Sequence, residues 1–388
     1  MHVTLNTDNM WLVAGLWMAL AAVSGFLAIR LKMPAALLEI IVGMFAGNLI
    51  ALRTNAWIDF VAGFGSILLT FLAGAEIDPV VLRRQLLPSS ALGAASFAAP
   101  FLAAMAYTFF VAHWTADASK IAGLAMSTTS VAVVYAVMIE SGLASKEFGQ
   151  LILAACFFTD LGTVVALGLL FANYNLWFAG LAVAIVVAVT VVPKLLPPAI
   201  ERTRRYVSEP ALRALFAVIF LLAALATYAR SEGVLPAYFL GLACAGMLTA
   251  MPDVKRRLQT MVMSLLAPFY FLKAGTYVEF GAAASSLGLI VVLFFVKVGA
   301  KIAGVLPLAR MAFRYGPANA NYLTLMMATG LTFGTISSLY GLTHHYIDQR
   351  QYTALVTVVI LTAIIPTAIA QALFKPTQEP EEMEAEVP

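Results

Sequence analysis

Residues 154–168, AACFFTDLGTVVALG, place the carboxylate of Asp160 in the middle of an apolar stretch that runs from Leu151 to Phe171. A charged side chain at the centre of a membrane span costs about 2.5–3.5 kcal/mol on insertion scales, and such residues normally face a bundle interior or a water-filled cavity. Of the 20 acidic residues, Asp160 is the only one that we place near the centre of a span. The stretch therefore predicts a membrane helix that carries an ion-handling carboxylate.

The composition of the whole chain is that of an all-α polytopic membrane protein. Its 388 residues are 62% hydrophobic and 11% charged, whereas a soluble globular protein carries roughly 25% charged residues. Apolar runs of about 20 residues fit helices rather than the strands of a barrel. We predict thirteen transmembrane helices, at 10–29, 34–52, 57–77, 87–112, 119–142, 148–171, 176–198, 210–229, 232–250, 258–278, 282–306, 318–341 and 351–373.

The remaining composition gives no reason to expect a cofactor, an enzymatic activity or a nucleic-acid partner. Cys156 and Cys244 lie inside apolar segments, without the spacing of a metal site or a disulfide. No glycine-rich phosphate loop with its lysine is present, which argues against ATP-driven transport by this chain alone. The N-terminus lacks the basic region of a cleaved signal peptide. The acidic, proline-containing tail, residues 374–388, is predicted to be disordered and cytoplasmic.

Lys and Arg residues are distributed unequally between the two sides of the predicted spans. Cytoplasmic connections carry an excess of these residues, and one side of this chain carries only Arg53, Lys120, Arg230 and Arg350 in its connections. This asymmetry predicts that the N-terminus lies outside and the C-terminus lies in the cytoplasm.

Two polar interruptions lie at matching places in the two halves of the chain. Residues 87–171 contain the fourth to sixth predicted helices, and residues 282–373 contain the eleventh to thirteenth. Equivalent helices of the two segments are seven apart, so they cross the membrane in opposite directions, as in an inverted repeat. Such paired interruptions mark the midplane site of a transporter, and a broken backbone is tolerated there only where it lines a cavity or is buried in protein. The alternative is that the small residues only allow close helix packing. The predicted broken-helix residues are Ser127, Thr128, Gly330, Thr332, Gly334 and Thr335.

Asp160 can hold a proton when neutral and a monovalent cation such as Na⁺ when ionised. The hydroxyl oxygens of Thr159, Thr129 and Ser130 are the candidates for further ion ligands. The alternative for Asp160 is a structural salt bridge that holds the bundle together.

Lys301 and Lys297 are the candidate counter-charges, in the segment VKVGAKIAGVLP. A buried lysine needs a partner, and we expect Lys301 to pair with Asp160 when no cation is bound. Lys297 lies four residues earlier and shares the helix face, and its alternatives are a second structural pair or snorkelling. Lys273 is expected to stabilise a helix C-terminus or a carbonyl group of a broken helix. The candidate pH sensors, all at outer connections, are His113, His344 and His345.

With these residues the chain resembles the cation:proton antiporter superfamily, in particular its bacterial NapA-like branch of Na⁺/H⁺ and K⁺/H⁺ exchangers. The resemblance covers roughly residues 10–373 and rests on the order and spacing of short motifs. These are Pro34…Glu39…Gly43, the run from Phe71 to Asp78, Thr129-Ser130-Val131, Thr159-Asp160, Pro268…Gly275 and Gly299-Ala300-Lys301.

The resemblance implies a homodimer that works by elevator-type alternating access. It implies a six-helix core, residues 87–171 and 282–373, in which two discontinuous helices cross near Asp160, and a dimerisation scaffold, residues 10–77 and 176–278. Asp160 matches the family's ion-binding aspartate, and Lys301 matches its core lysine. Electrogenic members carry two adjacent acids, whereas this chain has Thr159 at the first position. One acid predicts one cation per proton, although Lys301 leaves a two-proton cycle open.

We therefore expect a secondary-active antiporter of a bacterial inner membrane that exchanges Na⁺, or K⁺ or Li⁺, for H⁺ and serves pH homeostasis. Its partners would be these ions, membrane lipid and a second copy of the chain. One alternative is a Na⁺-coupled symporter of an organic anion with the same architecture. A non-transporting sensor or a channel is the other.

Overall fold

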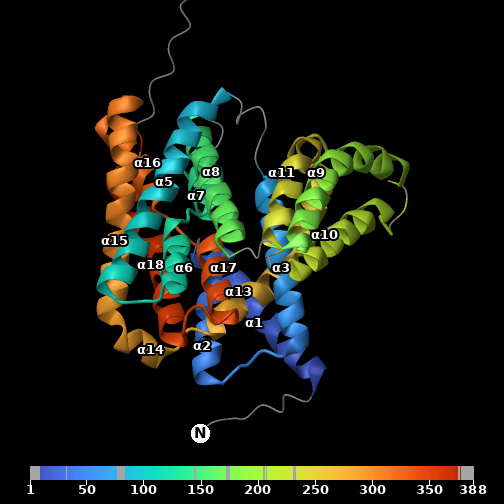
Figure 1. The fold of residues 1–388 in the computed structure, drawn as a ribbon, viewed down its shortest axis with the longest axis horizontal. Helices are drawn as coiled ribbons and strands as arrows, with labels where there is room; N and C mark the ends of the chain where they lie inside the picture. The colour runs from blue at the N-terminus through green and yellow to red at the C-terminus, as the bar shows by residue number, and fades with distance from the viewer. Residues whose placement is uncertain are drawn as a thin grey trace, which may run out of the picture.

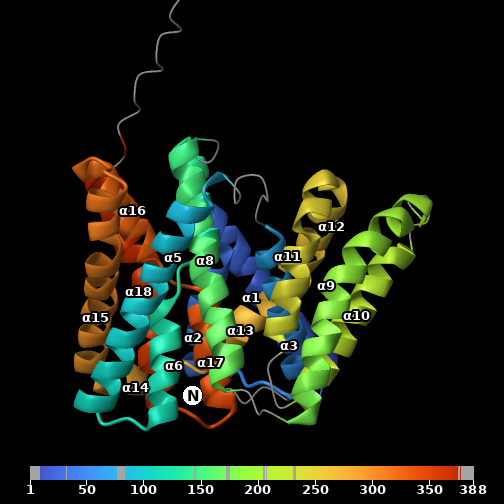
Figure 2. The same cartoon turned by 45° about the horizontal axis from the view of Figure 1, so that its top comes forward.

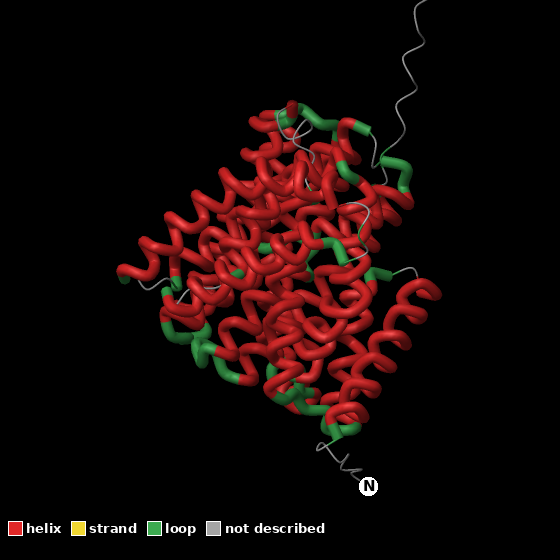
Figure 3. Tube along the Cα trace, turned by 90° about the vertical axis from the view of Figure 1, so that its right-hand side faces the viewer, coloured by secondary structure: helices red, strands yellow, loops and turns green. Residues whose placement is uncertain are grey.

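A computed structural model of the chain describes residues 9–31, 33–76, 84–143, 146–171, 175–203, 206, 208–229, 233–374 and 376. These residues form helices and connecting loops, with no strand among them (Figure 3). The predicted acidic tail beyond Pro376, together with Asp78 and Arg230, lies outside the described residues.

Helices lie at every predicted span. Their bounds are α1 Met10–Leu31, α2 Ala35–Leu49, α3 Ala56–Ala75, α5 Leu86–Ala106, α6 Ala116–Ser127, α7 Val131–Glu140, α8 Glu147–Leu170, α9 Leu176–Thr203, α10 Pro210–Tyr228, α11 Val234–Ala250, α12 Pro252–Met261, α13 Ala267–Thr276, α14 Phe280–Ser285, α15 Leu287–Pro307, α16 Pro317–Met327, α17 Thr332–Thr343 and α18 Gln349–Leu373. In the described chain, nine helical stretches are long and apolar enough to cross a membrane. α2 and α11 are shorter apolar helices. The fold is thus that of a multi-pass helical membrane protein.

The helices gather into two groups, which Figures 1 and 2 show side by side. The crossing bundle comprises α5 to α8 and α15 to α18: α5 packs on α6, α8 and α15, and α18 packs on α15, α16 and α17. The flanking helices comprise α1 to α3 and α9 to α13: α11 packs on α3 and α9, and α13 packs on α2 and α3. The division of the chain into a transporting core and a dimerisation scaffold stays a prediction.

Glycines bring α2 and α13 into backbone contact within the flanking helices. A Cβ atom at Gly43 would stand 2.2 Å from the carbonyl oxygen of Leu272, and one at Gly275 would stand 2.1 Å from that of Ile40. Small residues allow membrane helices to approach this closely. This contact gives the motif residues Gly43 and Gly275 a packing role.

The two halves of the crossing bundle share an order of backbone features. α5 ends in a π-helical turn, Tyr107–Val111, and α15 ends in another, Leu308–Ala312. A residue with positive φ follows each turn, His113 at 55° and Arg314 at 57°. A short helix then begins in each half and breaks off inside the bundle. These shared features support the predicted repeat.

Two buried tyrosines connect the groups. The hydroxyl of Tyr238 on α11 donates to the carbonyl oxygen of Phe157 on α8 at 3.2 Å. The hydroxyl of Tyr352 on α18 donates to the carbonyl oxygen of Ala274 on α13 at 2.6 Å. The flanking helices therefore contact α8 close to Asp160.

Candidate functional site

The first helix break separates α6 from α7 at residues 128–130. Thr128 is extended, with φ −65° and ψ 153°, so the last carbonyl groups of α6 lose their amide partners. Two side chains satisfy some of them: Ser127 Oγ donates to the Leu124 oxygen at 2.8 Å, and Thr128 Oγ1 donates to the Ala125 oxygen at 3.1 Å. The predicted polar interruption is therefore a broken helix.

The second break separates α16 from α17 at residues 328–331. The hydroxyl of Thr329 donates to the carbonyl oxygen of Met326 at 2.8 Å. Leu331 has φ −150° and ψ −78°, which ends any helical continuation. Thr335 lies within α17 and donates to the oxygen of Leu331 at 2.8 Å, and Thr332, the first residue of α17, is half-buried.

The two breaks bind each other at the centre of the crossing bundle. Thr129 Oγ1 donates to the carbonyl oxygen of Met327 at 3.0 Å, and the backbone amide of Ser130 donates to Thr329 Oγ1 at 3.4 Å. All four residues are fully or almost fully buried. The two discontinuous helices therefore meet at their breaks.

Lys301 holds the end of α6 in the first break. Its Nζ donates to Ser96 Oγ at 2.7 Å, to the Ser127 carbonyl oxygen at 2.8 Å and to Thr129 Oγ1 at 3.1 Å. An ammonium group has three protons to donate, so each has an acceptor. A cation at a helix C-terminus also interacts favourably with the helix dipole. Ser96 was not predicted, because nothing in the sequence of α5 indicates that it faces α15.

The predicted ion pair between Lys301 and Asp160 is not formed in this structure. Among the described residues, the ion pairs within 4.0 Å join Lys120 to Asp117, Arg257 to Glu209 and Lys273 to Asp59. Lys301 binds neutral oxygens instead, because the break offers the Ser127 carbonyl oxygen and the Thr129 hydroxyl, and α5 adds the Ser96 hydroxyl.

Asp160 lies in the middle of α8 and is 3% exposed. Its Oδ1 has no hydrogen-bond partner among the described residues. A bond of 3.4 Å between Thr163 Oγ1 and Ser127 Oγ connects the next turn of α8 to the first break. Thr159 Oγ1 donates to the Ala155 oxygen at 3.0 Å, so its lone pairs remain free to accept. A buried carboxylate oxygen without a donor is costly, and a proton or a metal cation would satisfy it.

Lys297 reaches the second break from the same helix face as Lys301. It is completely buried, and its Nζ has no hydrogen-bond partner in the described part of the chain. A Cβ atom at Gly330 would stand 2.2 Å from this Nζ and 3.0 Å from Thr128 Oγ1. Gly330 therefore leaves the space that the amine occupies. At Gly334, a Cβ would instead meet Val359 Cγ2 at 2.7 Å.

Lys273 lies apart from this cluster, in the last turn of α13. Its ammonium forms an ion pair of 2.7 Å with Asp59 on α3. This ion pair links two flanking helices, and the position of Lys273 in the last turn of α13 is also the one expected for a residue that stabilises a helix C-terminus. No three His, Cys, Asp or Glu residues of the described chain gather as a metal-binding group.

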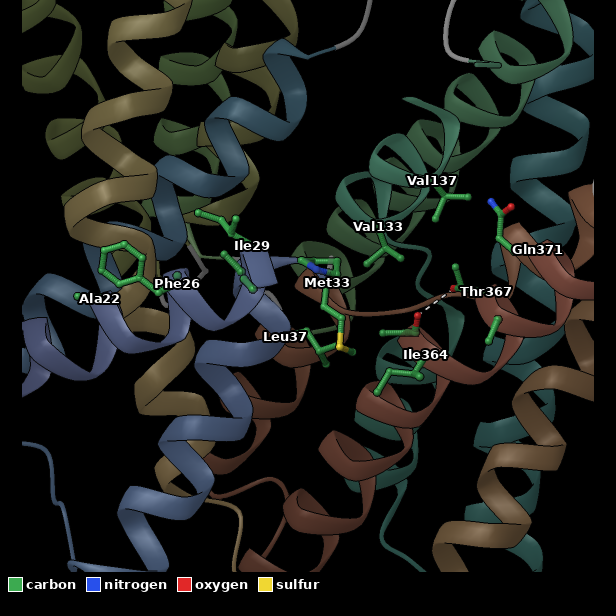
Figure 4. Close-up of a pocket in the computed structure, with 16 residues that line it drawn as sticks. Ala22, Phe26, Ile29, Met33, Leu37, Val133, Val137, Ile364, Thr367 and Gln371 are labelled. Carbon is green, nitrogen blue, oxygen red and sulfur yellow. Dashed lines mark hydrogen bonds between the residues drawn. The ribbon is translucent and has the colours of Figure 1, made fainter. Parts of the chain in front are cut away.

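A cavity of about 940 Å³ separates α1 and α2 from α7 and α18 (Figure 4). Phe26 and Met33 line one wall and Val137 and Ile364 the other, and Gln371 adds a polar group. A smaller cavity of about 180 Å³ lies between α3 and α13 of the flanking helices and α17 of the crossing bundle. Lys273 and Ile336 are among the residues in its walls. Neither cavity is lined by Asp160, Lys297 or Lys301.

Comparison with known proteins identifies a family for the chain. The family described as "Sodium/hydrogen exchanger, transmembrane" matches residues 18–375. The chain is 23% identical to the Na⁺/H⁺-K⁺ antiporter GerN of Bacillus cereus, over 90% of this chain and 92% of that protein. It is also 23% identical to Cation/H⁺ antiporter 18 of Arabidopsis thaliana, over 92% of this chain. The chain spans about half of that plant protein's length, 48%.

Among solved structures, the chain resembles the sodium proton antiporter MjNhaP1 from Methanocaldococcus jannaschii, determined at pH 8. The TM-score is 0.71 with 17% sequence identity, over 93% of this chain and 97% of that one. At this identity the likeness establishes the fold.

Proposed function

We propose that this chain, which belongs to the sodium/hydrogen exchanger family of the cation:proton antiporter superfamily, exchanges Na⁺, or K⁺ or Li⁺, for H⁺ across a bacterial inner membrane. The observation that carries the proposal is the buried Oδ1 atom of Asp160, which has no hydrogen-bond partner in the described part of the chain. One turn further along α8, Thr163 contacts Ser127 at the first helix break. Ionisable groups inside a membrane protein mark ion pathways and proton relays.

Asp160 binds either a proton or the cation, so that the two compete for one carboxylate. Thr159 is the nearest candidate for a further ligand, since its hydroxyl proton is already donated to the Ala155 oxygen. Thr129 and Ser130, at the first break, are the other candidates. Competition at one carboxylate is sufficient for exchange, because each half of the cycle must carry one of the two ions.

Alternating access would come from movement of the crossing bundle against the flanking helices, as in an elevator. The two cavities between these groups support this mechanism, since they leave space along part of the boundary. We assign thirteen crossings, with the N-terminus outside and the C-terminus in the cytoplasm, and a homodimer joined through the flanking helices.

Proton flux in proteoliposomes tests this function. Vesicles that contain a pH-sensitive dye and an acidic lumen would receive Na⁺, K⁺ or Li⁺, for the wild type, Asp160→Asn and the matched control Asp59→Asn. We expect cation-evoked alkalinisation in the wild type and in Asp59→Asn, but none in Asp160→Asn. Persistent exchange in Asp160→Asn would contradict the site. No response to any cation would contradict antiport and favour the organic-anion symporter.

A further inference from the structure

The larger cavity, between α1, α2, α7 and α18, is an apolar groove (Figure 4). None of its described lining residues is charged, and the polar side chains among them are Thr367 and Gln371. The Thr367 hydroxyl donates to the Ala363 carbonyl oxygen at 2.8 Å. The side-chain amide of Gln371 donates to Ser141 Oγ at 2.9 Å and to the Tyr322 hydroxyl at 3.1 Å. A polar ligand would find these donors occupied, whereas apolar walls favour an apolar occupant.

The α1 wall of the groove continues onto a surface that faces lipid. Phe26 and Ile29 line the groove and are 75% and 78% exposed, although α1 is long and apolar enough to cross a membrane. Exposed apolar side chains in such a helix contact lipid tails. Gly25 lies in the same wall, and a Cβ atom added there would meet nothing within 4 Å. The groove is therefore open to the surrounding membrane along α1.

The length of the groove suits one acyl chain, and a basic residue lies at its end. Ala363 and Gln371 are about 12 Å apart along the axis of α18, at 1.5 Å per residue. One leaflet of the hydrocarbon core is about 15 Å thick. Arg30 lies in the last turn of α1, is exposed and takes part in no ion pair of the described chain, and Lys32 follows it in the sequence. The positive charge at this end is complementary to a phosphate group.

We propose that this groove binds one acyl chain of an anionic phospholipid, with Arg30 at its phosphate. The chain enters from the membrane beside Gly25 and lies between α1 on one side and α7 and α18 on the other. Basic residues next to the membrane surface bind anionic head groups, so Arg30 sets the depth of the lipid. The lipid thus fills the space between the flanking helices and the crossing bundle. This inference does not depend on the proposed antiport.

A photoactivatable phosphatidylglycerol tests the site directly. The probe carries a diazirine in the middle of one acyl chain and is added to the purified, delipidated protein in detergent, after which mass spectrometry identifies the labelled peptides. We expect adducts on α1, α7 and α18 at the groove. Gly25→Leu, whose side chain occupies the open space, should reduce these adducts at least tenfold. The matched control is Gly15→Leu on the same helix, where an added Cβ also meets nothing within 4 Å, and it should label as the wild type does.

Undiminished labelling of Gly25→Leu, or adducts spread evenly over the exposed helices, would overturn the inference. Loss of labelling in both glycine variants would also overturn it, because the groove would then not be the site. A dimer fraction that falls in Gly25→Leu while its labelling is unchanged would instead assign the groove to a second copy of the chain.

Competition by unlabelled lipids tests the role of Arg30. Phosphatidylglycerol should displace the probe at a lower concentration than phosphatidylcholine does. Arg30→Gln should weaken phosphatidylglycerol about fivefold, the effect of one basic residue near an anionic lipid surface, and leave phosphatidylcholine unchanged. Arg53→Gln, an exposed basic residue away from the groove, should change neither. Equal competition by the two lipids in the wild type, or displacement by soluble glycerol phosphate without acyl chains, would contradict the proposal.

Discussion

The two helix breaks have the same place in their halves of the crossing bundle but different chemistry. The first break contains hydroxyl groups, and a lysine from α15 is bound there by three oxygens. The second contains Gly330, and a lysine from the same helix occupies the space without a bound acceptor. Hydroxyls fix a buried cation, whereas a glycine only makes room for one. The difference separates a lysine with three acceptors from one that has no acceptor among the described residues.

The largest effect should come from removing the lysine of the first break. Lys301→Met leaves the Ser127 carbonyl oxygen and two hydroxyls without their donor, and an unsatisfied buried group costs about 1–3 kcal/mol. We expect a loss of about 2–4 kcal/mol in the free energy of unfolding. Lys297→Met should be close to neutral, because the methyl group replaces an amine without partners. Thermal unfolding in detergent compares the two, and equal losses would remove the distinction between the breaks.

A smaller effect is expected when one hydroxyl is removed from the first break. Thr129→Val loses an acceptor for Lys301 and the donor to the Met327 oxygen. We expect a loss of about 1–2 kcal/mol in stability. The matched control is Thr335→Val in α17, since that hydroxyl only duplicates a helical bond to the Leu331 oxygen. A control that loses as much stability would show that the contact between the breaks is not special.

The helices that follow the two breaks, α7 and α17, face cavities of different size, which a bulky substitution can probe. Val137 on α7 lines the cavity of about 940 Å³, whereas Ile336 on α17 lines that of about 180 Å³. Val137→Trp should fold with stability within about 1 kcal/mol of the wild type, because the cavity has room. It should slow exchange several-fold if the two groups of helices move past each other. The cation concentration for half-maximal rate should not change. An unaltered rate would argue against movement at this cavity.

The smallest effect concerns the connections that follow the two breaks. Gly142 has φ 69° after α7, and His345 has φ 59° after α17, where it follows His344. Burial lowers the pKa of His344 below its ordinary value of 6.5, more than the bond to the Tyr340 carbonyl oxygen raises it, and His345 lowers it further.

The unfolded chain therefore binds more protons than the folded chain just below pH 6.5, so that stability should fall as the pH drops through this value. His344→Phe, which keeps a ring beside Tyr340, should remove this part of the pH dependence. Unfolding curves between pH 5 and 8 would show it. A variant with the wild-type pH dependence would contradict the assignment to His344.

Much of the architecture could be predicted from the sequence, because apolar runs and polar interruptions are local signals. The positions of both breaks follow from the hydroxyl-rich run Ser127 to Ser130 and from the stretch that contains Gly330. The partner of Lys301 could not be predicted. A carbonyl group freed by a break is invisible in the sequence, and a carboxylate is the partner that charge alone favours. Gly330 was predicted as part of a break, but its role as the space for Lys297 depends on the angle at which α15 meets the crossing.

The central claim is that a proton and a cation compete for Asp160. Proton release from the purified protein in a weakly buffered detergent solution measures this competition without transport. Addition of the transported cation to the wild type should acidify the solution, whereas Asp160→Asn should release no protons. Asp59→Asn should release protons as the wild type does. Wild-type release from Asp160→Asn would contradict the account.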